Sequence, residues 1–453
     1  MLQGIGTLRR TGTRPTGHGL AAGLLSFSSF FVFPALPLGR STGLAVPYVI
    51  AALLVMTWLG RLRRTEWVPL ALMIAPLMLS TGFALLAGDA LAPDVMPKLL
   101  AMLVLTFTIV VPTRYLLRVG YRREIIGGAA VAAVVHALAG AVQIEAFERY
   151  EFPFKEVFAS NPGMGMPVAW METYVLWVKR PFGLFAEPSA MAACIGPWLV
   201  VFSMALFSGD AAFRLDRRTR ALLLVGLSGG LGLVVLSRSG QAVPITLAAA
   251  TPAILSAFRS RMRASARWAV LLSGVGIVGG ASIWLTTRAS DRFSLDDNAS
   301  WQLRLESLRV ALAYLLGEGN LLFGVGPGQS VPELGASTLA GASSGGVTAI
   351  WSVTLTYAME TGFIGVGAML AVAVPMMRSI WRSTRRLEGM ICAGVWFFGV
   401  LLGTSYVQQP ALWMTMAALL SWRELVGDRP AERDSAFTKE PHGPAVRVSG
   451  EAT

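Results

Sequence analysis

Arginine residues divide the loops of this chain into two alternating sets. The sequence alternates between polar loops and apolar stretches, each about long enough to cross a hydrocarbon core of ~30 Å. Every second loop carries a cluster of arginines, at Arg61–Arg64, Arg114–Arg123, Arg214–Arg220, Arg259–Arg267 and Arg378–Arg386. Because positively charged loops stay on the cytoplasmic side of a membrane, this alternation predicts a polytopic membrane protein whose other loops face outward.

The composition makes lipid the solvent for most of the chain. Of its 453 residues, 54% are hydrophobic and only 14% are charged, whereas a soluble domain carries about 25% charged residues. The formal net charge of +12 is spread over short loops between apolar stretches instead of forming a folded basic face. We therefore exclude nucleic acid as a partner and expect the positive loops to contact anionic lipid headgroups.

An all-α fold follows from the length of the apolar stretches. Backbone groups in hydrocarbon must be hydrogen-bonded within the segment, and the strands of a barrel would need only about ten residues each. We predict about 12 transmembrane helices with both chain termini in the cytoplasm. The predicted spans are 20–37, 43–60, 67–87, 98–113, 124–144, 186–208, 219–236, 239–257, 267–286, 350–376, 387–405 and 409–425.

The chain divides into a membrane domain and two cytoplasmic ends. Residues 1–19 form an amino-terminal segment, residues 20–426 form the membrane domain, and residues 427–453 form a tail that we expect to be disordered. Cys194 and Cys392 both fall inside predicted spans. We interpret them as small apolar packing residues and not as a disulfide or a metal site.

Two long loops, residues 145–185 and 287–349, belong to the outward set, so chemistry on the outer side must come from them. The first contains Tyr174 and Trp177, which fit either a helix lying on the membrane surface or an aromatic platform that stacks sugar rings. The second predicts a helix from Trp301 to Leu316, followed by a Gly-rich turn and a Ser/Gly-rich stretch.

Two candidate sites combine an outward position with unexpected charge. Arg180 and Glu187 bracket an apolar turn where the chain enters the sixth span. Either this pair anchors and caps the start of the helix, or Arg180 binds an anion and Glu187 is a general base. Arg238 is the only charged residue of the tight turn Ser237–Gly240, which we predict on the outer side of the membrane, where positive charge is disfavoured. It either snorkels to lipid phosphate or binds a substrate phosphate through its planar guanidinium.

A third candidate site lies in the second long loop. Arg304 is near the start of the predicted helix, where a cation gains nothing from the helix dipole. The turn after this helix contains Gly324, Gly326 and Gly328. The backbone N–H groups of such a turn can cradle phosphate, although an ordinary turn has the same pattern.

A fourth candidate is Glu360, which lies inside the tenth predicted span. The helical rise from Trp351 places it roughly 13 Å along the span, near the middle of the bilayer. A carboxyl group at that depth must be protonated, paired or turned toward a cavity. A structural hydrogen bond to a neighbouring helix and a functional role are both consistent with this position.

These segments, in this order, resemble the O-antigen polymerase and O-antigen ligase superfamily of bacterial membrane glycosyltransferases, the Wzy and WaaL group. The matching stretches are Arg180–Ser189, Ser237–Gly240, Arg304 ahead of Gly324–Gly328, and Glu360–Gly365. The resemblance implies a polytopic fold similar to that of other lipid-linked (GT-C type) glycosyltransferases. Its members transfer a glycan from undecaprenyl diphosphate to a hydroxyl at the outer face of the cytoplasmic membrane, with no metal and no other cofactor.

The resemblance also implies roles for individual residues. A metal-free site needs arginines to neutralise the diphosphate leaving group and a base to take the proton of the acceptor hydroxyl. The catalytic roles would belong to Glu187, Arg180, Arg238 and Arg304. Binding of the diphosphate or the sugar would belong to Arg288, Gly324, Gly326, Gly328, Trp301 and Trp351. The expected partners are an undecaprenyl-diphosphate-linked oligosaccharide, membrane lipids, a chain-length regulator and a flippase.

The chain departs from the ligase pattern at one position. Ligases carry a His in the second long periplasmic loop near the next span, where this chain reads Thr348–Ser352; its histidines are His18, His136 and His442. The departure favours a polymerase that acts at the periplasmic side of the bacterial inner membrane and builds O-antigen, capsule or exopolysaccharide. A lipid A-core ligase remains an alternative. A secondary transporter is a further one, because many transporters have about 12 spans with both ends inside.

Overall fold

The computed structural model describes residues 16–32, 35–37, 43–45, 63–86, 106–160, 179–207, 213, 215–259, 299–317, 321–330, 352–403 and 409–428. These residues are helical apart from connecting turns and a short antiparallel pair of strands, β1 (Ala35–Pro37) and β2 (Gly43–Ala45). The predicted all-α membrane fold is confirmed in this coarse sense, because five of the described helices are long and apolar enough to cross a membrane. The total of about 12 spans remains a prediction.

The five long helices coincide with predicted spans. They are α3 (Arg64–Leu86), α6 (Arg122–Glu148), α9 (Pro188–Phe207), α10 (Arg217–Leu236) and α15 (Val353–Trp381). Two of them start at side-chain caps: Asp216 Oδ1 accepts from Thr219 N at 3.0 Å, and Ser352 Oγ accepts from Leu355 N at 3.1 Å. Such caps satisfy backbone N–H groups that have no partner inside the helix.

The other helical segments of the described residues are shorter. Eight are α-helical: α1 (Thr16–Ser28), α5 (Val111–Arg118), α7 (Lys155–Ala159), α11 (Ala242–Arg259), α13 (Ala299–Gly317), α16 (Arg386–Phe398), α17 (Pro410–Leu420) and α18 (Trp422–Val426). Two are π-helical turns: η2 (Thr106–Val110) and η6 (Gly399–Gly403). The α13 bounds confirm the helix predicted for the second long loop.

Several predicted spans differ from the structure, and residues 43–60, predicted as one helix, begin with strand β2. The prediction of one helix over residues 20–37 was wrong, because α1 ends at Ser28 and β1 occupies residues 35–37. Prolines at positions 34 and 37 explain this, since proline lacks an N–H donor and disfavours helix in the residue before it. The last, residues 409–425, is divided at Ser421 into α17 and α18. The predicted span 267–286 lies outside the described residues.

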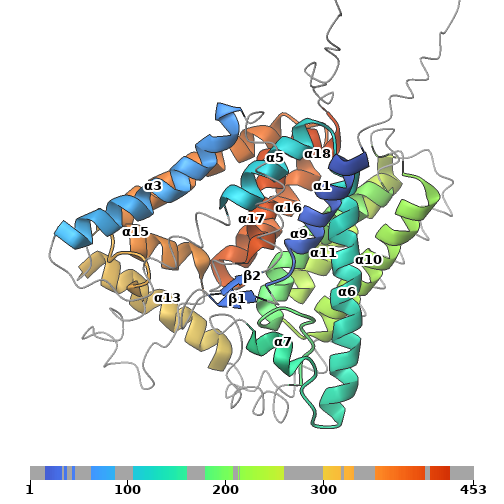
Figure 1. The fold of residues 1–453 in the computed structure, drawn as a ribbon, viewed down its shortest axis with the longest axis horizontal. Coiled ribbons are helices and arrows are strands. Elements are labelled where there is room, and N and C mark those ends of the chain that lie inside the picture. Colours follow the sequence, from blue (N-terminus) through green and yellow to red (C-terminus); the bar gives the residue numbers. More distant parts are fainter. Residues whose placement is uncertain are drawn as a thin grey trace, which may run out of the picture.

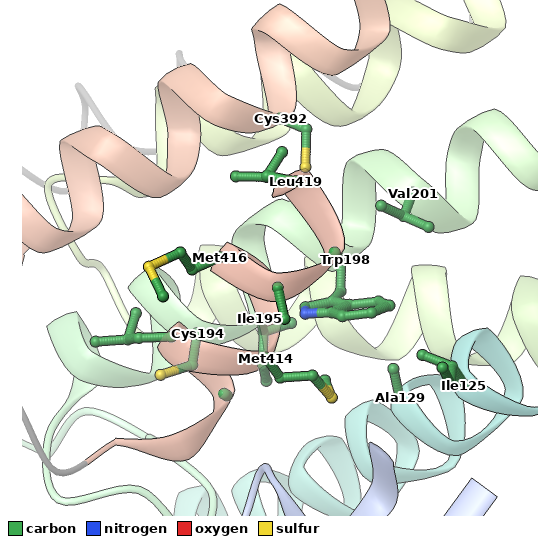
Figure 2. Packing of buried hydrophobic residues seen from close by; sticks show 14 of the residues in the cluster. Ile125, Ala129, Cys194, Ile195, Trp198, Val201, Cys392, Met414, Met416 and Leu419 are labelled. Carbon is green, nitrogen blue, oxygen red and sulfur yellow. The ribbon is translucent and has the colours of Figure 1, made fainter. Parts of the chain in front are cut away.

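Helix α9 forms the centre of the described bundle. It contacts α6, α10, α11, α16 and α17, while α3 and α15 pair at the other side of the molecule (Figure 1). Trp198 of α9 is 1% exposed, and its Nε1 donates to Thr415 Oγ1 of α17 at 2.9 Å. Figure 2 shows this indole among Ile195, Met414 and Ala129. Cys194 and Cys392 lie buried as free thiols in the same cluster, which confirms their predicted packing role.

Arginine-rich segments meet at one end of the bundle. Arg114 Nη1 of α5 donates to Glu66 O near the start of α3 at 3.4 Å. Burial lowers the pKa of Arg114, and the charges of Glu66 and Glu424 oppose this effect. Glu424 belongs to α18, whose Trp422 Nε1 donates to Arg385 O beside the start of α16 at 3.2 Å. Parts of the first, second and fifth Arg-rich loops therefore share one end, as expected for loops on one side of a membrane.

Candidate functional site

The segment that leads into α9 is held by the side chain of Gln143 on α6. The Gln143 Oε1 atom accepts from Phe182 N and from Gly183 N, both at 2.9 Å, and Gln143 Nε2 donates to Gly183 O at 2.7 Å. Gln143 is 0% exposed. Both ends of one buried amide are therefore satisfied by the backbone between Arg180 and Glu187.

His136, two turns earlier on α6, binds the next residue of this segment. Its Nδ1 accepts from Leu184 N at 3.0 Å, so the ring proton resides on Nε2, which faces Phe30 O at 3.2 Å. The imidazole is 0% exposed and stacks between Phe31 and Phe185, with centroid distances of 4.8 and 4.3 Å. The neutral imidazole therefore has a structural role: it joins the backbone of Leu184 to the backbone of Phe30.

Neither His136 nor Gln143 was among the residues predicted for the site of the enzyme. Their spacing of seven residues, about two helical turns, puts both polar side chains on one face of an otherwise apolar helix. That pattern could have indicated that α6 binds a backbone segment, although it does not identify which one.

Glu187 directly precedes the first residue of α9, Pro188. Its carbonyl oxygen accepts from Met191 N at 3.0 Å, and its carboxylate Oε1 accepts from Ser189 Oγ at 2.6 Å. Proline suits the first helical position because its missing N–H would have no partner there, and the helix N-terminus stabilises a nearby carboxylate. The half-buried Glu187 is therefore held in place at the start of α9.

The turn that carries Arg238 lies next to this segment. Gln241 Nε2 donates to Ser189 O at 3.3 Å, which joins the α10–α11 turn to the start of α9. Arg238 itself is half-buried and has a φ of 51°, in a region that a non-glycine residue rarely adopts. Ser237 stabilises the turn, since its Oγ donates to Val234 O at 2.7 Å and accepts from Ser239 N at 3.3 Å. The structure thus brings the first two predicted sites together.

The third and fourth predicted sites also meet, at a break in α15. Residue Gly362 has non-helical dihedral angles, so the chain cannot continue its own hydrogen-bond ladder there. The loop 321–330 supplies the missing partners in both directions. Val325 N donates to Met359 O at 2.9 Å and Gly326 N donates to Glu360 O at 3.2 Å, while Phe363 N donates to Leu321 O at 2.8 Å and Ile364 N donates to Leu322 O at 3.3 Å.

This exchange changes the interpretation of the Gly-rich turn. The N–H groups of Val325 and Gly326 satisfy carbonyl groups of α15, so this pair serves the helix break and not a bound phosphate. Gly324, Gly326 and Gly328 all have positive φ, which explains why the turn is rich in glycine.

Glu360 lies at the same break and is 2% exposed. Its Oε1 accepts from Ser330 Oγ at 3.0 Å, and its carbonyl oxygen accepts from Ser80 Oγ of α3 at 2.6 Å. The carboxyl group is thus hydrogen-bonded to the loop, and the backbone of the same residue is hydrogen-bonded to α3. A carboxyl group with such a partner can be accommodated in an apolar bundle.

The remaining predicted residues are placed only in part. Trp301 and Arg304 lie on the first two turns of α13, whereas Arg288, Trp351, Tyr174 and Trp177 lie outside the described residues. Across the parts of the chain that the structure describes, no group of three or more His, Cys, Asp or Glu side chains is arranged to hold a metal ion.

The fold defines the class of the protein. Large apolar side chains are exposed on the outer faces of the long helices, as on Leu79 of α3, Val225 of α10 and Leu370 of α15. Such surfaces suit lipid and are avoided in water. The chain is thus a polytopic α-helical membrane protein. No family model and no curated protein matches the sequence.

Proposed function

We propose that the protein is a polysaccharide polymerase of the bacterial inner membrane. It transfers a growing glycan from undecaprenyl diphosphate to the next lipid-linked repeat unit at the periplasmic face. The product is an O-antigen, a capsule or an exopolysaccharide. In this proposal the enzyme is an inverting glycosyltransferase that uses neither a metal nor another cofactor.

The observation that carries the proposal is the hydrogen bond between Gln241 and Ser189. It brings the turn of Arg238 against the segment that holds Arg180 and Glu187. The turn of Arg238 therefore lies next to the start of α9, which Glu187 directly precedes. Two arginines and a carboxylate are the groups that transfer from a diphosphate carrier requires, since developing negative charge and an acceptor proton must both be accommodated.

The chemistry assigns a role to each of these groups. The acceptor hydroxyl oxygen forms a bond to the anomeric carbon of the donor while the bond from that carbon to the diphosphate breaks. Glu187 takes the hydroxyl proton, and the hydrogen bond from Ser189 Oγ orients its carboxylate. Arg180 and Arg238 neutralise the departing diphosphate, with Arg304 as a further cation.

The orientation of the helices agrees with an outward site. Helix α6 has 27 residues, so its two ends are about 40 Å apart. Its first residue, Arg122, belongs to an Arg-rich loop, which would be cytoplasmic, whereas Gln143 and the segment that it binds lie near its last turn. Under the positive-inside rule, the charged residues of this segment then face the periplasm.

One observation favours a second candidate, a secondary transporter. Transporters often place their binding sites at broken helices inside the membrane, and α15 is broken beside a buried Glu360. The two functions differ in which residues they need. A transporter requires Glu360, whereas the polymerase requires the charged groups Arg180, Glu187 and Arg238. The absence of a His near Thr348–Ser352 makes a lipid A-core ligase the weaker alternative.

The decisive experiment deletes the gene and resolves the carrier-linked and surface glycans of the cell on a gel. Single repeat units that persist where a ladder of long chains had been would support a polymerase. Full-length chains left on the lipid carrier would indicate a ligase. An unchanged ladder would contradict both and favour the transporter.

A further inference from the structure

The segment between Arg180 and Glu187 depends on α6 for its conformation. Residues 180–187 form turns and bends and belong to no helix or strand. Within the segment, the Phe185 N to Phe182 O contact at 3.3 Å is long. By contrast, Gln143 and His136 bind its backbone at 2.7 to 3.0 Å. The side chains of one transmembrane helix therefore determine the path of this loop.

Packing makes the same contacts rigid. Phe182 is 0% exposed and lies in a small apolar cluster with Val32, Phe147 and Phe158. On the other side, the His136 ring is stacked between two phenylalanine rings and cannot turn away without breaking both contacts. Gly183 completes the fit, because a Cβ at this position would lie 2.9 Å from His136 O and 3.0 Å from His136 Nδ1.

The residues bound by α6, 182–184, lie in the middle of the segment 180–187, and the two charged groups lie at its ends. Arg180 is two residues before Phe182, and Glu187 is three residues after Leu184. A released loop of this length could move Arg180 by several ångströms and change the orientation of Glu187 at the start of α9, since an extended chain spans about 3.3 Å per residue. A displacement of 1 Å in a catalytic group can cost about 100-fold in rate.

We propose that His136 and Gln143 are positioning residues. By binding the backbone of residues 182–184, they keep Arg180 and Glu187 in the positions that glycan transfer requires. The role in glycan transfer rests on the proposed polymerase function, whereas the hydrogen bonds that fix residues 182–184 are a property of the fold. His136 acts as a hydrogen-bond acceptor for Leu184 N, and Gln143 acts as both donor and acceptor for Gly183. Neither side chain touches substrate in this proposal.

Two substitutions at His136 separate this role from simple packing. His136→Asn puts an amide oxygen near the position of Nδ1 and can still accept from Leu184 N. His136→Gln extends further, reaches the position of Nε2 toward Phe30 O, and lacks the acceptor for Leu184 N. Both variants lose the aromatic stacking. Thr415→Val serves as the control, because it removes a buried hydrogen bond to Trp198 in another part of the core.

The first measurement is backbone hydrogen exchange of the full-length protein in nanodiscs, followed in peptides that cover residues 182–185. We expect exchange there to rise roughly tenfold or more in His136→Gln and in Gln143→Met. Exchange should stay close to that of the wild type in His136→Asn and in Thr415→Val. Equal exchange in the two His136 variants, or protection unchanged in His136→Gln, would overturn the proposal.

The second measurement is the glycan ladder of a deletion strain that expresses each variant at matched membrane levels. We expect long chains from His136→Asn and Thr415→Val, and strongly shortened or absent chains from His136→Gln and Gln143→Met. Full-length chains from His136→Gln despite raised exchange would show that these hydrogen bonds do not serve transfer. If deletion of the gene leaves the ladder intact while hydrogen exchange responds as expected, His136 and Gln143 do fix this backbone, but the proposed polymerase function is wrong.

Discussion

Gly324 and Gly362 pack backbone against backbone at the break in α15. A Cβ on Gly324 would lie 2.6 Å from Gly362 N, and a Cβ on Gly362 would lie 2.6 Å from Gly324 N. Their φ angles are 72° and 62°, which L side chains rarely adopt. The loop and the broken helix therefore require each other, because neither backbone has room for a side chain where they meet.

The first prediction concerns this contact. Gly362→Ala combines a strained backbone angle with a contact that forces the loop away, and each effect costs about 1–3 kcal/mol. We expect the variant to lower the thermal unfolding midpoint of the purified protein by several degrees. A thiol-reactive fluorogenic dye can follow unfolding, because Cys194 and Cys392 are both buried.

Gly367→Ala is the matched control for this prediction. Gly367 lies in the same helix, but a Cβ there would meet nothing within 4 Å. Alanine should leave the unfolding midpoint unchanged or raise it, since glycine is the poorer helix former. Similar midpoints for the Gly362 and Gly367 variants would mean that the two backbones do not pack as described.

Local features of the sequence predicted the long helices and pointed to Arg180 and Arg238 as unusual charges. The apolar length of residues 124–144 and the arginines beside it are enough to predict α6. Charge is unexpected at both positions, between apolar stretches of the chain. In each case the sequence pattern and the helix or charged residue that it indicates lie in the same short segment, so the prediction needs no knowledge of the tertiary structure.

Contacts between distant segments could not be predicted in this way. The break in α15 depends on four backbone hydrogen bonds to residues 321–326, which lie more than 30 positions earlier. Gln143 and Gly183 are likewise separated by 40 positions. A sequence pattern shows that Gln143 is polar in an apolar helix, but the backbone that it binds is defined only by the fold.

The second prediction tests whether Glu360 is a structural residue. Glu360→Gln retains an oxygen that accepts from Ser330, whereas Glu360→Ala leaves the buried hydroxyl group of Ser330 unsatisfied. We expect the alanine variant to cost about 1–3 kcal/mol of stability and the glutamine variant much less. The glycan ladder should persist in Glu360→Gln.

A double-mutant cycle sharpens this test. If the carboxyl and hydroxyl groups interact, Ser330→Ala combined with Glu360→Ala should destabilise the protein by less than the sum of the two single variants. Full additivity would show that the two groups are energetically independent. Loss of function in a stable Glu360→Gln protein would instead support the transporter.

The third prediction addresses Arg238. Arg238→Ala should lower the yield of long glycan chains about 100-fold, because removal of one preorganised donor to developing charge has an effect of this order. Arg238→Lys keeps the charge but not the planar pair of donors, so we expect an intermediate loss. Equal and full activity in both variants, at matched expression, would exclude a phosphate-binding role.

The fourth prediction addresses Glu187 as the base. Glu187→Gln can still accept from Ser189 Oγ and should fold, but it cannot take a proton from the acceptor. We expect the variant to produce single repeat units and no ladder while its unfolding midpoint stays near that of the wild type. Near-normal polymer from this variant would remove Glu187 from the mechanism. Ser189→Ala should reduce polymer without abolishing it, because the carboxylate itself remains.

The last prediction concerns Asp428, which fastens the end of α18 to the turn between α15 and α16. Its Oδ2 accepts from Ser383 Oγ at 2.5 Å and from Thr384 N at 2.8 Å, and its Oδ1 accepts from Thr384 Oγ1 at 2.6 Å. Partial burial opposes ionisation, but these hydrogen bonds to the charged form outweigh it and hold the pKa below its ordinary value.

A depressed carboxyl pKa stabilises the folded state at every pH above the unfolded value of about 3.9. The stabilisation is lost as the pH falls through the folded pKa. We therefore expect Asp428→Asn to lower the unfolding midpoint near pH 7, and the difference from the wild type to narrow as the pH falls below about 4. Tryptophan fluorescence can follow this, because Trp422 lies in α18 beside the fastened turn. A difference that stays constant from neutral to acidic pH would show that the charge of Asp428 contributes nothing to the contact.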